Sequence, residues 1–273
     1  MSEELFGAAD AASWVAVPEV ADDKYSRGVV GFVTGSTRYP GAAVLGIEAA
    51  LRTGVGMARF VGPDAVAGLV LARRPEAVAD LGRVQAWVLG SGQDAQARDE
   101  AEAQRLRDAI EQGLPTVLDG GALDLSGRAR GPLVLTPHAR ELARLTGESV
   151  DTILAAPAAA TVSAADRVGA VVLLKGHTTH VADPGGQLLR VRSAPTWLAT
   201  AGAGDALAGV LGALIATHHE RLASDARALL PLAATAAVIH GLAAERASAG
   251  GPFTILDLCA EIPHVVRALL VYG

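Results

Sequence analysis

The chain has 273 residues, a formal net charge of −6 and a single cysteine, Cys259. One cysteine excludes an internal disulfide framework and fits a reducing compartment. The acidic balance, with no basic cluster, argues against a nucleic-acid-binding protein. Hydrophobic residues make up 51% of the chain and aromatic residues only 4%, so we expect a core of Ala, Val and Leu side chains. Such a core suits helices packed on a buried sheet better than a β-sandwich.

No targeting or membrane-spanning segment is predicted. The first ten residues are acidic, whereas a signal peptide begins with basic residues that precede an apolar run. The long apolar stretch near the C-terminus is interrupted by Pro231 and His240. We therefore expect a cytoplasmic protein that does not enter a membrane.

Apolar runs and helix-like patterns alternate along the chain, and each pattern predicts one element. Strands separated by helices form parallel sheets that are covered on both faces, so we predict a single α/β domain with a mainly parallel central sheet. In chain order, the patterns predict a strand at 28–35, a helix at 41–54, a strand at 56–62, a helix at 65–74, a strand at 84–92, a helix at 96–113, strands at 114–121 and 131–138, a helix at 138–147, a strand at 170–176, a hairpin at 178–192 with its turn at 183–186, and three closing helices that begin near 203.

Glycine and polar residues gather in the loops that follow the predicted strands. In such a fold, ligands bind beyond the carboxyl ends of the strands, in the loops that lead into helices. One loop of this kind is ordinary turn chemistry, but six together favour a binding cleft. The six loops are 35–42, 89–94, 119–123, 135–141, 175–180 and 200–205.

Three side chains in these loops are candidates for chemistry. Asp205 opens an apolar helix behind Gly202 and Gly204, which allow close backbone approach to a ligand, and the first N–H groups of that helix favour an anion. The alternative is that Asp205 only caps its own helix. Lys175 ends an apolar strand, where it either supplies positive charge to the cleft or extends to solvent. His138 either faces the cleft or is a polar residue at a helix start.

Standard nucleotide and zinc motifs are missing from the chain. It contains neither a G-x-x-x-x-G-K-[ST] loop nor a G-x-G-x-x-G loop between a strand and a helix, so the phosphate site would be the turn before Asp205. His218 and His219 are adjacent at a predicted helix end, where we expect them to be solvated. No pattern has the spacing of zinc ligands, and no metal ligand is predicted.

Five stretches occur in an informative order: GSTRYPGAAVLGIEAALRTGVGMARF, RPEAV, LTPHARELARLTG, VVLLKGHTTHVADPGG and ATAGAGDALAGVLGALIA. Together they resemble the ADP/ATP-dependent NAD(P)H-hydrate dehydratase family, the carbohydrate-kinase-like domain of the ribokinase-like superfamily. The resemblance implies a ribokinase-like fold with helices on both faces of the sheet. It begins near Asp22, so residues 22–273 are assigned to this domain and residues 1–21 to an N-terminal extension.

The resemblance also implies a repair reaction. Hydrated NADH or NADPH is returned to the intact cofactor by phosphorylation of the unwanted hydroxyl and elimination of phosphate, while ADP is hydrolysed to AMP, or ATP is used instead. Asp205 matches the family's base, Mg²⁺ is expected with the phosphates, and a homotetramer is expected. Ala42, Gly92, His138 and Asp205 match positions that contact the hydrated dinucleotide. Lys175, Gly176, His177, Thr178, Thr179 and Gly204 match positions around the adenine nucleotide, and the implied anion hole is Gly202, Ala203 and Gly204.

Three loops depart from the family pattern. The sequence has GSGQD at 90–94 where the family usually has GPGLG, DGGAL at 119–123 in place of DADAL, and TAGAGD at 200–205 in place of TGGTGD. Ala203 therefore lacks a hydroxyl that could bind phosphate. These differences leave open the catalytic efficiency and the preference between ADP and ATP. Two alternatives stand beside the dehydratase: a kinase of a small hydroxymethyl heterocycle, and a non-catalytic nucleotide-binding relative.

Overall fold

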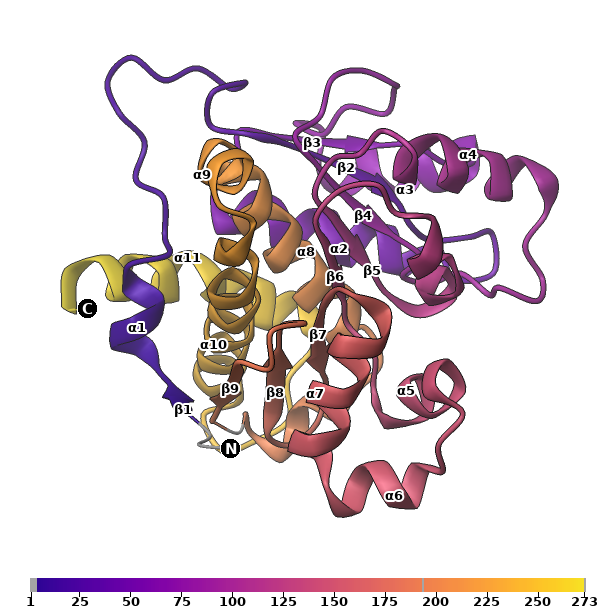
Figure 1. Ribbon diagram of the computed structural model, residues 1–273. Helices are drawn as coiled ribbons and strands as arrows, with labels where there is room; N and C mark the ends of the chain where they lie inside the picture. The colour runs from indigo at the N-terminus through magenta and orange to yellow at the C-terminus, as the bar shows by residue number, and fades with distance from the viewer. Residues whose placement is uncertain (1–3, 193, 273) are drawn as a thin grey trace.

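The computed structural model describes residues 4–192 and 194–272. Within them, nine strands form one sheet in the order β1-β9-β8-β7-β6-β5-β4-β2-β3 (Figure 1). The strands are β1 (Glu4–Phe6), β2 (Val29–Val33), β3 (Met57–Phe60), β4 (Ala86–Leu89), β5 (Thr116–Leu118), β6 (Leu133–Leu135), β7 (Val171–Leu174), β8 (Thr179–Ala182) and β9 (Leu188–Val191).

Helices connect most of the strands. The α-helices are α1 (Ala8–Ala12), α2 (Gly41–Thr53), α3 (Asp64–Arg73), α4 (Glu100–Ile110), α5 (Ala139–Thr146), α6 (Val150–Ala155), α7 (Pro157–Val168), α8 (Ala203–Thr217), α9 (His219–Ser224), α10 (Leu229–Ser248) and α11 (Ile255–Tyr272). Short 3-10 segments are η1 (Gly120–Arg128), η2 (Thr196–Leu198) and η3 (Ala226–Ala228).

The mainly parallel sheet predicted from the sequence is confirmed. Strands β2 to β7 pair in parallel, whereas β8 runs antiparallel to both β7 and β9, as the predicted hairpin requires. In the β6–β7 register, for example, Val134 lies opposite Val171. Parallel strands bring their carboxyl ends to one edge of the sheet, which is why the loops after β2, β4, β5, β6 and β7 meet there.

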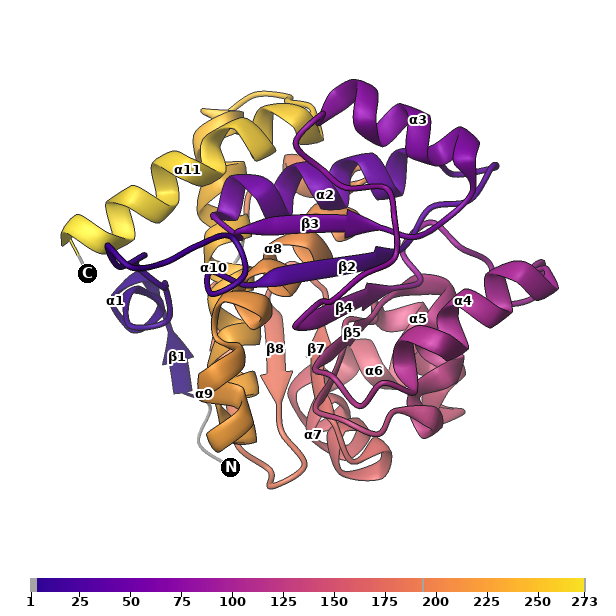
Figure 2. The same ribbon diagram turned by 90° about the horizontal axis from the view of Figure 1, so that it is seen from above.

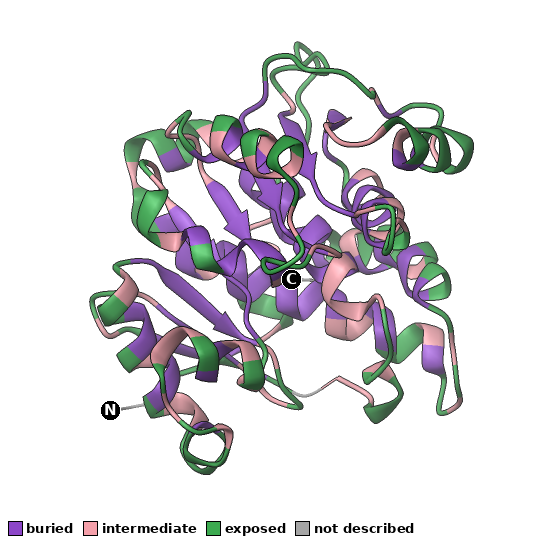
Figure 3. Ribbon diagram, turned by 90° about the vertical axis from the view of Figure 1, so that its right-hand side faces the viewer, coloured by how far each residue is buried: buried purple, intermediate pink, exposed green. Residues whose placement is uncertain are grey.

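The sheet lies between two helical layers, and each layer has its own apolar core (Figures 1 and 2). Side chains along β2 alternate between the two faces of the sheet and so contribute to both cores. Val30 and Phe32 face one core, and Val29 and Val33 face the other. The first core contains side chains of α2, α8, α10 and α11, and the second contains those of α4, α5 and α7. The central strands β2, β4, β5, β6 and β7 are accordingly buried on both faces (Figure 3).

The apolar stretch near the C-terminus, which we expected to be interrupted at Pro231 and His240, forms one continuous helix, α10. Pro231 falls in the first turn, where proline is tolerated, so the helix continues through His240 to Ser248. By length and hydropathy alone, the stretch Ala226–Ser248 could cross a membrane, and it is the one such helix among the described residues. Within this fold 78% of its apolar window is buried, because it packs against α8 and α11 as a core helix.

Several segments were not predicted. Strand β1 pairs in parallel with β9 at the sheet edge, but its three residues are too few to show an alternating pattern. Helices α6, α7 and α9 also carried no prediction. The expected solvation of His218 and His219 is wrong, since both are half-buried. His218 Nδ1 lies 2.8 Å from the Leu214 carbonyl oxygen, and burial lowers the pKa of its ring.

Candidate active site

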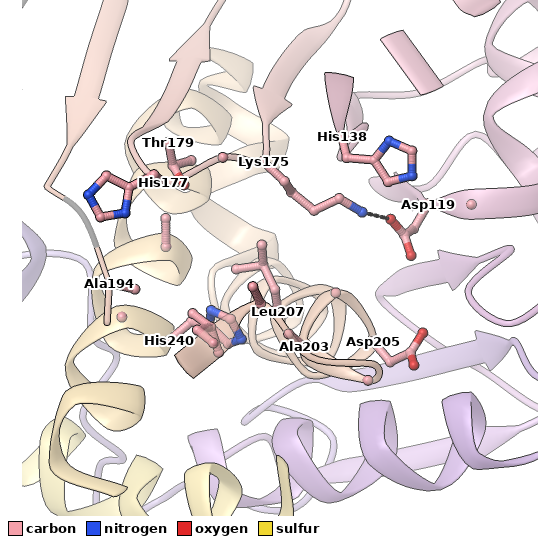
Figure 4. Close-up of a pocket in the computed structure, with 18 of the residues that line it drawn as sticks. Asp119, His138, Lys175, His177, Thr179, Ala194, Ala203, Asp205, Leu207 and His240 are labelled. Carbon is pink, nitrogen blue, oxygen red and sulfur yellow. Dashed lines mark hydrogen bonds and ion pairs between the residues drawn. The ribbon is translucent and has the colours of Figure 1, made fainter. Parts of the chain in front are cut away.

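A cavity of about 820 Å³ lies at the carboxyl ends of the parallel strands, against the start of α8 (Figure 4). Its wall comes from the loops after β4, β5, β6 and β7, from the segment before α8 and from one face of α10. The structure thus brings most of the predicted site residues together. Those that line the cavity are Gly92, His138, Lys175, Gly176, His177, Thr179, Gly202, Ala203, Gly204 and Asp205.

Two predicted residues, Ala42 and Thr178, do not line this cavity. Ala42 is buried and packs directly against Gly92. A Cβ added to Gly92 would lie only 2.3 Å from the Cβ of Ala42. Gly92 also has a φ of 67°, in the left-handed region that favours glycine. Ala42 therefore shapes the cavity wall through Gly92. Thr178 lines a neighbouring cavity of about 320 Å³, together with Lys175 and His177.

The start of α8 lines the cavity with Gly202, Ala203 and Gly204, and the Ala203 N–H makes only a long bond of 3.4 Å to the Thr200 carbonyl oxygen. Gly202 is the N-cap with a φ of 93°, and it makes no side-chain cap hydrogen bond, so the first N–H groups of α8 are not capped by a side chain. Asp205 is the third residue of the helix. The alternative in which Asp205 caps α8 is therefore wrong. A Cβ added to Gly204 would lie 3.3 Å from Lys175 Nζ, which places a cation beside the same turn.

Asp205 has an unusual acidity for an aspartate. Its pKa is raised from the ordinary value of 3.8 to about 6, mainly by burial; the nearby charge of Asp119 also raises the pKa, and Lys175 partly opposes both. At neutral pH the carboxylate is ionised, yet it is a stronger base than an exposed aspartate. A carboxylate with this acidity in a cleft is suited to accept a proton from a hydroxyl.

Lys175 is held by a buried carboxylate that we did not predict. Its Nζ donates to Asp119 Oδ1 at 2.6 Å and lies 3.7 Å from Glu141 Oε2. Asp119 also accepts hydrogen bonds from Ser91 Oγ and Thr136 Oγ1, at 3.0 and 2.9 Å. Burial alone would lower the pKa of Lys175, but the carboxylates outweigh it and the pKa is raised. Lys175 therefore keeps its charge inside the cavity and does not extend to solvent.

Both interpretations of His138 hold at once. The ring Nδ1 accepts hydrogen bonds from the backbone N–H groups of Arg140 and Glu141, each at 3.1 Å, so His138 caps α5. The backbone N–H of His138 in turn donates to Glu141 Oε2. The ring also lines the cavity and is half-exposed. Because Nδ1 is an acceptor, the ring proton is on Nε2, which lies 3.5 Å from Glu141 Oε1 beside the cavity.

Several cavity residues were missed from the sequence, among them Asp119, Glu141 and His240. Asp119 follows β5 directly before two glycines, a position typical of ligand loops, and could have been found there. Glu141 stands three residues after His138, the spacing of a capping pair, and so had a purely structural explanation. His240 comes from the middle of α10, where its only signal was an ionisable residue within an apolar run.

The arrangement combines a basic carboxylate, a fixed cation and a row of backbone donors. This combination fits transfer of a phosphoryl group to a hydroxyl, since catalysis of that reaction consists mainly of positioning and charge stabilisation. Among the described residues, no group of three or more His, Cys, Asp or Glu side chains could hold a metal ion by itself. A metal at this site would need ligands from the phosphates.

Comparison with known proteins agrees with this geometry. Residues 30–261 match the family model described as NAD(P)H-hydrate dehydratase. A bifunctional NAD(P)H-hydrate repair enzyme of Mycobacterium tuberculosis is 43% identical over 228 residues, which are 78% of this chain and 46% of that protein. An ADP-dependent (S)-NAD(P)H-hydrate dehydratase of Xanthomonas campestris is 37% identical over 231 residues, 76% of this chain and 78% of that one. The chain spans about half the length of the mycobacterial relatives it matches.

A solved structure is similar over almost the full length. The crystal structure of the ADP/ATP-dependent NAD(P)H-hydrate dehydratase from Bacillus subtilis, co-crystallised with ATP and Mg²⁺, superposes with a TM-score of 0.86. It is 25% identical, and the superposition covers 98% of this chain and 99% of that one. The ribokinase-like fold expected from the sequence is thereby confirmed.

Proposed function

The chain belongs to the NAD(P)H-hydrate dehydratase family, and on that premise we propose that it is an ADP-dependent (S)-NAD(P)H-hydrate dehydratase. It would restore NADH or NADPH from the hydrated form while ADP is hydrolysed to AMP and phosphate. The observation that carries this proposal is Asp205, a carboxylate with a pKa of about 6 at the N-terminal turn of α8. It shares one cavity with Lys175, a buried cation next to the same turn.

The reaction proceeds in two steps. Asp205 accepts the proton of the hydroxyl on the hydrated nicotinamide ring, and the hydroxyl oxygen attacks the terminal phosphoryl group of ADP, so that the bond to AMP breaks. The carbon–oxygen bond then breaks, phosphate leaves with the former hydroxyl oxygen, and the neighbouring ring carbon loses a proton. The atoms balance: hydrate plus ADP gives intact cofactor, AMP and phosphate.

The start of α8 stabilises the charge that develops on the transferred phosphoryl group. We assign the anion hole to the backbone N–H groups of Gly202, Ala203 and Gly204, which the helix end supplements. Lys175 lies beside this turn and adds a positive charge. Because these donors are fixed by the fold, they need no reorganisation during the reaction.

The two ligands occupy the two ends of the cavity. We assign the adenine nucleotide to the side formed by Lys175, Gly176, His177, Thr178, Thr179 and Gly204, with Thr178 acting from the far side of that loop. We assign the hydrated dinucleotide to Ala42, Gly92, His138 and Asp205, with Ala42 acting through Gly92.

The residues present fit a Mg²⁺ ion that accompanies the phosphates. Asp119 and Glu141 direct carboxylate oxygens to within 4 Å of Lys175 Nζ, so these oxygens already face a cation. Mg²⁺ would therefore be held by phosphate oxygens and water, as it usually is with nucleotides. When bound, Mg²⁺ neutralises phosphate charge. The relative from Bacillus subtilis was co-crystallised with ATP and Mg²⁺.

Residue range, assembly and location complete the proposal. We assign the catalytic domain to residues 22–273 and an N-terminal extension to residues 1–21, whose strand β1 pairs with β9 at the edge of the same sheet. The assembly we propose is a homotetramer in the cytoplasm. Size-exclusion chromatography with light scattering tests the tetramer, and removal of residues 1–21 tests whether the domain keeps its activity.

The test of the proposed function is a reaction with hydrated NADH, ADP and Mg²⁺, monitored by recovery of the absorbance of reduced nicotinamide. Recovery with release of one AMP per NADH supports the dehydratase. A stable phosphoester of the substrate would instead indicate the kinase alternative, and nucleotide binding without turnover would indicate the non-catalytic relative. Parallel reactions with ATP and with hydrated NADPH measure the preference between ADP and ATP and the preference between hydrated NADH and hydrated NADPH.

A further inference from the structure

His240 is a buried ionisable residue that the proposed mechanism does not use. It lies on α10, it lines the cavity, and its side chain is only 6% exposed. Its Nε2 atom is buried and makes no hydrogen bond within the described part of the chain. Buried polar atoms in native proteins almost always have a partner, so this atom calls for a ligand.

The surroundings of His240 favour a flat apolar ligand group. The ring contacts the backbone of Ala203, Leu207 lines the same cavity (Figure 4), and Gly241 follows His240 on the cavity face of α10. A Cβ added to Gly241 would meet only the Cβ of Ala194, at 3.7 Å, so the helix surface is open and smooth here. Such a surface suits a heterocyclic base better than a ribose or a phosphate.

The chemistry of the ring decides which ligand group it can bind. The pKa of His240 is lowered from 6.5 to about 4, mainly by burial; the backbone of Ala203 opposes this shift and the charge of Lys175 adds to it, so the ring is neutral at neutral pH. A neutral imidazole has one donor and one acceptor nitrogen. The hydrogen bond to the Ala203 backbone favours a protonated nitrogen, and Nε2 has no partner within the described residues, so the proton is on Nδ1 and Nε2 must accept. Phosphate oxygens are acceptors and cannot satisfy it, whereas the exocyclic amine of adenine can.

We propose that His240 is a specificity-determining residue that accepts a hydrogen bond from the exocyclic amine of the adenine base. This inference rests on the proposed function, because it requires the nucleotide to occupy this cavity. It predicts that the enzyme prefers ADP to inosine diphosphate, which has a carbonyl oxygen in place of the amine. Removal of the acceptor should abolish that preference and leave the chemistry at Asp205 intact.

The test measures binding of ADP and of inosine diphosphate to the full chain by calorimetry. His240→Leu keeps a similar volume without an acceptor, and it should weaken ADP binding about 5- to 30-fold, as expected for one lost hydrogen bond. Binding of inosine diphosphate should change less than about twofold, since its hydrogen bond is already missing. His240→Gln, which restores an acceptor, should recover part of the ADP affinity.

A matched control lies on the same helix. Thr235 also has a buried oxygen without a hydrogen bond, but it is not among the residues that line the cavity, so Thr235→Val should leave both affinities unchanged. Equal weakening of both nucleotides by His240→Leu, or no weakening of ADP, would overturn the role of His240. If the wild-type protein restores NADH but shows no preference between the nucleotides, only this inference fails. If it restores no NADH with any nucleotide, the proposed function fails.

Discussion

Replacement of Asp205 by Asn should have opposite effects on the reaction rate and on the stability of the fold. The folded protein raises the pKa of Asp205 from 3.8 to about 6, so ionisation of this carboxyl opposes folding. A difference of about 2 pKa units corresponds to about 3 kcal/mol when the group is ionised in both states. Asp205→Asn removes this charge and keeps the shape of the side chain. We therefore expect the variant to be more stable than the wild type by up to about 3 kcal/mol at neutral pH.

The pH dependence of this gain has a definite sign. Below pH 3.8 the carboxyl is protonated in the folded and unfolded states, so its ionisation does not lower the free energy of unfolding of the wild type. As the pH rises from 3.8 towards 6, the unfolded state loses its proton first, and the folded state loses stability until the pH passes the folded pKa. The stability difference should be about 1 kcal/mol at pH 4.5 and about 3 kcal/mol at pH 7.5.

Two assays check the Asp205→Asn variant. Urea unfolding at pH 4.5 and 7.5 measures the stability difference, in which titrations shared by both proteins cancel. NADH recovery should fall about 10²- to 10⁴-fold, because the amide cannot accept the hydroxyl proton. Affinity for ADP should change little. A variant that retains more than about a tenth of the wild-type rate, or a stability gain that does not depend on pH, would refute this role of Asp205.

Two further substitutions test the neighbouring parts of the site. Lys175→Ala should weaken ADP binding about tenfold or more in calorimetry and lower stability, because it also leaves the Asp119 carboxylate buried without its cation; unchanged ADP affinity would contradict our placement of the phosphates. Gly92→Ala should destabilise the protein by about 1 kcal/mol or more in thermal unfolding, since its φ is 67° and the new Cβ would clash with Ala42. Gly68→Ala, in the open middle of α3, is the matched control and should stabilise slightly.

The sheet was predictable because its signal is local. Strands β2, β4, β5, β6 and β7 are short runs rich in Val and Leu that are buried on both faces. Strand β1 lacks such a run, since Glu4 and Leu5 are exposed and only Phe6 is buried. It forms because its backbone pairs with β9, a contact between segments far apart in the sequence that no local pattern contains.

The site was predictable where one residue type carries a role by itself. Asp205 and Lys175 stand next to glycines at element boundaries, and the structure places both in the cavity. Asp119 and His240 were missed because their roles depend on segments that are distant in the sequence and meet only in the fold. Asp119 matters because Lys175 arrives from a strand more than fifty residues later, and His240 because α10 packs beneath the start of α8.

The central claim is that the hydroxyl of the hydrated cofactor, activated by Asp205, attacks the phosphoryl group of ADP. It can be tested directly with hydrated NADH that carries a heavy oxygen isotope at that hydroxyl. The reaction is run to completion with ADP and Mg²⁺, and the released phosphate is analysed by mass spectrometry. We predict that the phosphate contains one labelled oxygen per NADH restored. Unlabelled phosphate, with the isotope released into water, would contradict the account.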